Sequence, residues 1–361
     1  MKSSNSIIII LYIVLSVLLG ASDISYAQDI HFSQSNMTPL LLNPALTGVS
    51  GGNNRACLNY KNQWLGMGGQ GAVYRTALFS YDTRLLTKKF RNGYIGAGIN
   101  AYKDVAGDLK MGTTQLNLSF AGIVYISKKQ LISGGIQGGF VQKSISTSSM
   151  QWDSQYDGTT GAFNSSLPSN DIVSIPPYTY GDFSAGLSWA YNNKQTYMGA
   201  NNQLKVNFGI AAFHINRPNQ KLNPYSTNIT DNLDPKFVVH SAAQIGIAST
   251  DYEFVPTAVF YMQGKSYETD LGAMIRWTLK GESRYTGYNQ GMALSLGAQY
   301  RLKDAIIPMV MFEYSSYALG ISYDVNTSTL KDGTHGRGGI EISLRFSSPN
   351  PFAHSSSRLL D

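Results

Sequence analysis

Residues 291–302, GMALSLGAQYRL, alternate between apolar and polar side chains at almost every position. Period-two alternation is typical of a β-strand with one apolar face and one polar face. The same pattern recurs along the chain and predicts about 14 strands. We place them at residues 54–64, 72–82, 94–104, 113–126, 131–145, 182–191, 204–215, 236–248, 253–262, 267–278, 290–302, 304–314, 317–325 and 338–346.

The lengths of these segments indicate what their apolar faces contact. They run about 9 to 15 residues, whereas strands of soluble proteins average nearer 5–6 residues. Long strands suit a tilted passage across a bilayer, and the apolar sides of the clear segments carry no charge. Aromatic residues lie near strand ends, as in the aromatic girdles that membrane β-barrels place at the two membrane–water interfaces. They are Trp64, Tyr191, Trp277, Tyr300 and Phe346. The pattern favours an all-β outer-membrane barrel of antiparallel strands over a secreted β-sandwich.

The connections between the segments support this fold. With the N-terminus in the periplasm and alternating strand directions, the two longest connections, 146–181 and 216–235, both fall outside. The short turns 127–130 and 249–252 then fall in the periplasm, as is typical of outer-membrane barrels.

Three positions leave the strand assignment locally open. The register around Arg75 is unsettled, because facing it inward also brings its apolar neighbours inward. Pro256 and Pro308 lie within predicted strands. Each removes a donor from the hydrogen-bond ladder, so we expect a bulge or a strand end there.

The first residues have the pattern of a secretory signal peptide. Lys2 precedes an apolar run at 7–19, and Ser25-Tyr26-Ala27 is a small-x-small cleavage signal. We expect residues 1–27 to be removed; a retained anchor is the alternative, although the run is short for a span. The expected organisation is then an N-terminal periplasmic or plug segment at 28–52, a barrel at 53–346 and a tail at 347–361.

Composition narrows the function classes. The single cysteine, Cys57, excludes an internal disulfide. A net charge of +6 is modest for 361 residues and does not indicate nucleic-acid binding. No dinucleotide fingerprint, phosphate-binding loop or zinc motif is present, so we predict neither a cofactor nor a metal.

Two sets of residues invite a chemical interpretation. His214 and His240 lie on adjacent predicted strands, and Ser241 paired with His214 would suggest a barrel lipase. The alternative, which we favour, is a hydrogen-bonded histidine lining a polar lumen. Asp324, Asn326 and Ser328 alternate like metal ligands, but every strand alternates in this way. A turn at the barrel rim is the favoured interpretation, and no catalytic residue is predicted.

A third set lies in the long connection 146–181, which is rich in Ser, Thr, Asn and Gly and contains several aromatic residues. Trp152 and Tyr156 are the first two of these. Aromatic side chains on loops often contribute most of the binding energy of a contact surface. A solvated loop and a binding surface remain equally open here.

The stretch QDIHFSQSNMTPLLLNPALTG is not explained by alternation. With Phe32, Ser33 and Gln34 followed by Asn43, Pro44, Ala45 and Gly48, it resembles the PorP/SprF family of type IX secretion proteins in Bacteroidota. Further motifs follow in the family's order: Gly209, His214, Pro218, His240, Gly320, Ser322, Tyr323, Asp324 and Glu341. The departures are Asn62, where the family usually has arginine, and the length of the connection 146–181.

The resemblance implies a non-enzymatic outer-membrane component that binds a secreted cargo domain or other secretion subunits, for protein secretion, surface attachment or gliding. Residues 39–49 are expected to plug the periplasmic mouth or to dock on a periplasmic partner. A passive diffusion porin and the barrel lipase remain as alternatives. Besides outer-membrane lipid, the candidate partner-binding residues are Phe32, Asn43, Pro44, Trp152, Tyr156, His214, Pro218, His240, Tyr323 and Asp324.

Overall fold

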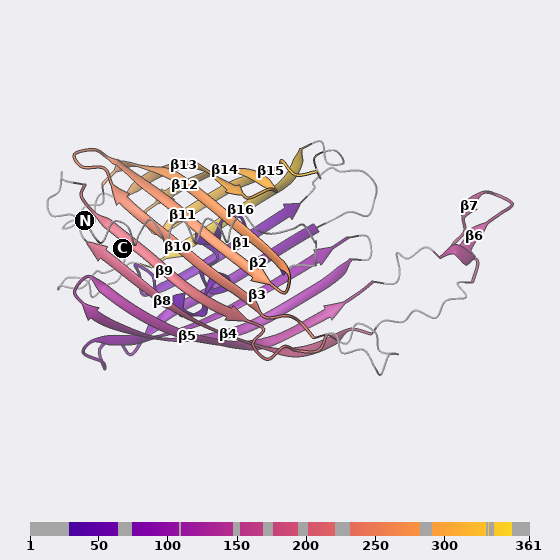
Figure 1. The fold of residues 1–361 in the computed structure, drawn as a ribbon, viewed down its shortest axis with the longest axis horizontal. Helices are drawn as coiled ribbons and strands as arrows, with labels where there is room; N and C mark the ends of the chain where they lie inside the picture. The colour runs from indigo at the N-terminus through magenta and orange to yellow at the C-terminus, as the bar shows by residue number, and fades with distance from the viewer. Residues whose placement is uncertain are drawn as a thin grey trace, which may run out of the picture.

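The computed structural model describes residues 29–63, 74–107, 110–146, 152–168, 176–193, 201–220, 232–281, 291–329, 331 and 336–348. Fourteen strands in this part of the chain form one closed antiparallel barrel, in which β1 pairs with β16 (Figure 1). The predicted fold is confirmed. The strands are β1 (Asn54–Gln63), β2 (Tyr74–Leu85), β3 (Gly93–Ala106), β4 (Met111–Ser127), β5 (Gln130–Ser144), β8 (Tyr178–Asn193), β9 (Leu204–Phe213), β10 (Lys236–Gly246), β11 (Tyr252–Gln263), β12 (Ser266–Lys280), β13 (Met292–Arg301), β14 (Ala305–Tyr314), β15 (Tyr317–Asn326) and β16 (Arg337–Ser347).

The two faces of the barrel wall follow the alternation in the sequence. In β13, Leu296 and Tyr300 are exposed on the outside, whereas Ser295 and Gln299 are buried inside. Aromatic pairs stand at strand ends on the outer face: Trp189–Tyr191, Tyr252–Trp277 and Tyr317–Phe346. The barrel therefore presents an apolar belt to lipid and a polar wall to its lumen.

The barrel has two unlike ends. At one, which we call the loop end, residues 145–177 and 214–235 connect strands. At the other, the turn end, the connections include the two-residue turns 128–129 and 315–316. β1 begins at the turn end and β16 finishes there.

The structure resolves the three open positions. In β2, Leu78, Ser80 and Asp82 are buried, so Arg75 faces outward near the loop end of the strand. The expectation for Pro256 and Pro308 was wrong: β11 and β14 run through them. The pairing lapses beside each proline and resumes in the same register, as between Ile306↔Val325 and Met309↔Ser322. The missing N–H donor of each proline therefore interrupts strand pairing locally but does not produce a β-bulge.

The lumen is occupied by the chain's own N-terminal segment, residues 29–52, which we call the plug (Figure 1). It contains three short helices, η1 (Ser35–Met37), α2 (Pro39–Leu42) and η2 (Pro44–Leu46). Prolines begin α2 and η2, where a missing N–H costs nothing. Among the described residues, no helix is long and apolar enough to cross a membrane.

The plug crosses the lumen from one end to the other. Its first residue, Asp29, donates its backbone N–H to Gln263 at the loop end of β11. Further along, Phe32 packs on Leu78 and Tyr102. At the turn end, Val49 packs against the inward side chains of Tyr94 and Ile123, among others. Residues 39–49, expected to plug the periplasmic mouth or to dock on a periplasmic partner, lie inside the barrel, and Val49 reaches the turn end.

Candidate functional site

Several inward-facing glycines of the wall, Gly96, Gly135, Gly186 and Gly320 among them, form a seat for the plug. A Cβ atom on any of them would approach plug atoms far more closely than van der Waals contact allows. The clashing atoms would be Thr47 O at 2.1 Å from Gly96, Pro44 O at 2.4 Å from Gly135, Asn43 Oδ1 at 2.0 Å from Gly186 and Gln34 Oε1 at 2.0 Å from Gly320. The wall and the plug are thus shaped for one another along much of the lumen.

Asn43 fastens the middle of the plug to the wall, and it is fully buried. Its Nδ2 donates to the backbone carbonyls of Leu187, at 3.0 Å, and Ile210, at 3.2 Å. Its Oδ1 accepts the N–H of Ala45 and thereby caps η2. The same Nδ2 lies 3.0 Å from Nε2 of His240. Two of the predicted candidate residues are therefore brought together, as parts of one buried hydrogen-bond network.

We expect Asn43→Ala to weaken the docking of the plug by about 1–3 kcal/mol, because two buried carbonyls lose their donor. Hydrogen exchange of the amides at 43–49 should become correspondingly faster. Asn36→Ala, at an exposed position in the same plug, is the matched control and should leave exchange unchanged. Equal exchange in both variants would show that Asn43 does not hold the plug.

The wall carboxylate of Glu341 receives the plug's backbone near the loop end. Its Oε2 accepts the N–H of Ser33 at 2.7 Å, and its Oε1 accepts the N–H of Gln34 at 3.0 Å. The side chain of Gln34 donates to Ser322 Oγ and to the carbonyl of Glu341. Hydrogen bonds to a carboxylate are stronger than neutral ones, so Glu341 fixes the register of this part of the plug.

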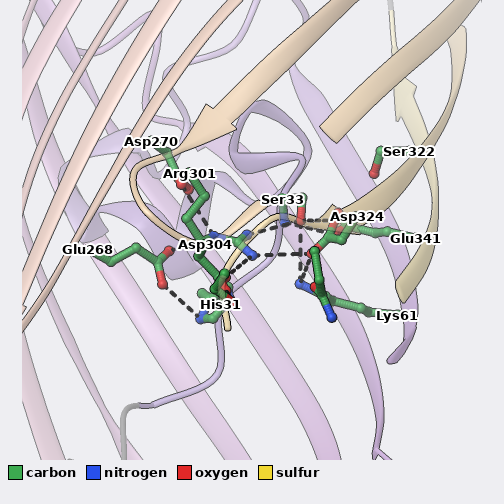
Figure 2. Close-up of polar contacts among 12 residues, drawn as sticks. His31, Ser33, Lys61, Glu268, Asp270, Arg301, Asp304, Ser322, Asp324 and Glu341 are labelled. Atoms are coloured by element: carbon green, nitrogen blue, oxygen red, sulfur yellow. Dashed lines mark hydrogen bonds and ion pairs between the residues drawn. The ribbon is translucent and has the colours of Figure 1, made fainter. Parts of the chain in front are cut away.

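Arg301 is the centre of a buried charged network around Ser33 (Figure 2). Its guanidinium lies 3.2 Å from Asp324 Oδ2 and donates to Ser33 Oγ at 3.2 Å. Its Nε lies 3.4 Å from Glu268 Oε1 and 3.3 Å from Asp270 Oδ1. One cation thus bridges β12, β15 and the plug.

Lys61 of β1 supplies the second cation of this network (Figure 2). Its Nζ lies 3.3 Å from Asp324 Oδ2 and also 3.3 Å from Ser33 Oγ. Asp324 in turn accepts the hydroxyl of Ser33 at 2.8 Å. Asp324 is therefore an ion-paired wall residue, and in the described part of the chain no group of residues is arranged to hold a metal.

His31 lies at the edge of the network, with its Nδ1 3.5 Å from Glu268 Oε2. Burial, followed by the nearby charges of Arg301 and Lys61, holds the pKa of His31 well below its usual range. The imidazole is therefore neutral near pH 7 and adds no third cation.

His214 forms a latch between the plug and the wall at the loop end. Its Nδ1 lies 2.9 Å from Asp182 Oδ1, and its Nε2 lies 2.5 Å from Asp29 Oδ2. Burial disfavours the charged imidazole, but the carboxylates of Asp29 and Asp182 outweigh it and raise the pKa of His214 to about 9. Although burial opposes it, the charge of His214 also holds the pKa of Asp29 well below its usual range.

This latch predicts a pH dependence for docking of the plug's first residues. The raised pKa of His214 contributes stability that is complete below the unfolded value of 6.5 and disappears as pH rises through about 9. The lowered pKa of Asp29 contributes stability above its ordinary value of 3.8, and this is lost as pH falls below it. The latch is therefore strongest between about pH 4 and 6.5.

We expect the exchange protection factors of amides 29–33 to fall between pH 7 and 10. The corresponding loss of docking free energy is roughly 3 kcal/mol at most. His214→Gln should have low protection throughout and a flat pH profile. A wild-type profile that is equally flat would contradict the latch.

The two histidines and Ser241 do not form a hydrolase constellation. His214 directly follows β9, whereas His240 pairs with Gly209, well inside the sheet. Ser241, adjacent to His240 in an alternating strand, belongs to the opposite face of the wall. The two histidines bind different partners, which agrees with the interpretation as lumen-lining residues.

The remaining candidates lie apart from the lumen. Tyr323 is exposed on the outer face of β15. Pro218 is buried in the loop-end connection after β9, where its carbonyl accepts the N–H of Leu233. Trp152 precedes a hairpin of η4 (Asp153–Gln155), β6 (Tyr156–Asp157) and β7 (Ala162–Phe163). In this hairpin Tyr156 and Phe163 pair across the strands, and both are exposed.

Sequence reasoning missed the residues that hold the plug. Asp29, Lys61 and Arg301 were not among the candidates, and Glu341 was noted only as part of a family motif, although charges on the inner face near one end of several strands were visible in the sequence. Their convergence depends on how the strands are staggered around the barrel, which alternation does not reveal.

Comparison with known proteins shows the family to which the chain belongs. Residues 24–346 match the model of a family described as "Type IX secretion system membrane protein PorP/SprF". The chain belongs to the PorP/SprF family. This PorP/SprF protein is accordingly an integral barrel of the outer membrane and a component of the type IX secretion system. A search of curated sequences finds no significant relative.

Solved structures resembling this PorP/SprF barrel share little of its sequence. The CymD monoaromatic hydrocarbon channel is 12% identical with a TM-score of 0.41, covering 90% of this chain and 95% of that one. The β domain of the Bordetella autotransporter BrkA is 10% identical with a TM-score of 0.40, covering 83% and 100%. The Ralstonia pickettii toluene transporter TbuX is 11% identical with a TM-score of 0.39, covering 85% and 90%. Such distant likeness carries no conclusion about what this chain does.

Proposed function

We propose that this type IX secretion component is a non-enzymatic docking barrel, which holds a secreted cargo domain or another secretion subunit at its loop end. The observation that supports this most is the plug, which occupies the lumen and contacts the wall from Asp29 to Val49. A barrel filled by its own chain is suited to present surfaces rather than to pass solutes. We place the loop end at the cell surface, since outer loops are the longer ones in such barrels.

The hairpin at 152–168 is the contact surface that we favour. It presents Tyr156 and Phe163 side by side, and aromatic side chains are typical anchors of protein interfaces. The connection 145–177 contains aspartates but no lysine or arginine, so it also favours a basic partner. Bound in this way, a secreted protein would stay attached to the cell for surface display or gliding.

Purification of the tagged protein from its own outer membrane in mild detergent, followed by mass spectrometry, tests the proposal. We expect a secreted protein or a secretion subunit in near-stoichiometric amount. The pair Tyr156→Ala and Phe163→Ala should lose it, whereas Thr160→Ala, exposed in the same hairpin, should retain it. A barrel without partner, together with normal protein secretion in a deletion strain, would overturn the proposal.

A further inference from the structure

A cavity of about 600 Å³ lies at the turn end, between the plug and the inner wall. Its volume is within the range of ordinary ligand sites, which is ~300–1,000 Å³. Part of its rim is formed by Ser315 and Ser316, in the turn between β14 and β15, and by Ser347 and Ser348 at the end of β16. We call it the vestibule; it is separate from the hairpin and from the network around Arg301.

The two sides of the vestibule differ in chemistry. The plug contributes an apolar side of Pro39, Leu42, Leu46 and Val49, continued by Val259 of β11. The wall contributes four cations, Arg55, Lys205, Arg276 and Arg345, and one anion, Glu313. Asp82 and Glu253 pair with Arg55 and Arg276, so four positive charges face three negative ones. A ligand here would meet an apolar surface and a net positive charge.

Arg345 is the cation best placed to receive a ligand. Arg276 is engaged, with Nε and Nη2 on Glu313 at 2.8 and 2.6 Å and Nη1 on Glu253 at 3.2 Å. The contact of Arg345 with Glu313 measures 3.8 Å, which is too long for a hydrogen bond, and its side chain is 27% exposed. A guanidinium in this state can receive a carboxylate through two parallel hydrogen bonds.

We propose that the vestibule binds an acidic, partly apolar peptide segment of a partner protein that approaches from the turn end. The carboxylates would pair with Arg345 and the neighbouring cations, and the apolar side chains would lie on Leu42, Leu46 and Val49. The wall around the vestibule is a closed ladder of strands, so bilayer lipid has no path from the side. This surface is independent of the loop-end contact, and either proposal can fail alone.

Fluorescence anisotropy with the whole protein in detergent micelles tests the vestibule. The probe is a fluorescein-labelled hexapeptide, Leu-Glu-Val-Asp-Leu-Glu, compared with a version that carries lysine at the three acidic positions. We expect saturable binding of the acidic peptide alone. Arg345→Glu should weaken it by about tenfold or more, since attraction becomes repulsion. Arg91→Glu, exposed in a turn at the same end and outside the vestibule, is the matched control.

The alternatives have distinct signatures. Equal binding of both peptides, or unchanged binding by Arg345→Glu, overturns the proposal. Displacement of the acidic peptide by laurate at equal concentration also overturns it, because a lipid carboxylate would then be the better ligand. Retention of the folded, heat-modifiable gel mobility by both variants excludes unfolding as the cause of a loss.

Discussion

Deletion of residues 29–50 is expected to convert a non-conducting barrel into one that conducts ions. Barrels of eight strands are filled by their own side chains, whereas those of 16–18 leave an aqueous channel, and fourteen strands lie near the open limit. Here the plug fills that space with Phe32, Met37 and Leu40, all fully buried. In planar bilayers we expect the whole chain to remain near background and the deletion to raise conductance on the order of tenfold or more.

A second variant covers the possibility that the shortened barrel does not fold. Asn43→Ala combined with Glu341→Gln keeps the plug but weakens two of its attachments to the wall. Brief channel openings are expected, in contrast to the closed parent. High conductance of the unaltered chain would favour the diffusion porin, and silence of both folded variants would show that the plug does not close the lumen.

Among single substitutions of the described residues that face the lumen, Arg301→Met is expected to lower the stability of the folded barrel the most. It keeps an unbranched apolar stem but removes the guanidinium, and so leaves Glu268, Asp270 and Asp324 buried without their common cation. Removing one partner of a buried ion pair typically costs about 3–5 kcal/mol. The expected result is a large fall in the urea midpoint for unfolding in detergent, followed by gel mobility.

Two further variants distinguish the loss of the Arg301 network from the loss of an arginine side chain in general. Arg75→Met removes a charge from the outer face of β2, where the side chain is exposed, and should change the midpoint little. Arg301→Lys keeps the charge but loses the fork of donors, so it should lie between the other two. A midpoint for Arg301→Met equal to that of Arg75→Met would contradict the role given to the network.

Alternation was sufficient to predict the barrel, because a wall between lipid and a polar lumen imposes a period of two on every strand. It failed to fix the register around Arg75, where both faces of the segment are mixed and the residue lies at the edge of the belt. It also overestimated the effect of Pro256 and Pro308, because neighbouring pairs hold the register across a missing donor.

The plug illustrates what the sequence could not reveal. Its composition indicated neither a strand nor disorder, and the family motif identified Asn43 and Pro44 without saying what they contact. Their partners, Gly186 and Gly135, lie in strands far along the chain, and in the sequence they read as ordinary strand glycines. The position of Asp29 at the loop end likewise follows from long-range contacts alone.

Disulfide trapping in intact cells tests most directly whether the plug threads the lumen from the loop end. In a Cys57→Ala background, Asp29→Cys is paired with Gln263→Cys, whose parent residues are hydrogen-bonded, or with Ser316→Cys at the turn end. On oxidation we predict a cross-link with the first partner and none with the second. A cross-link to position 316, or to neither, would contradict a plug that runs from the loop end to the turn end.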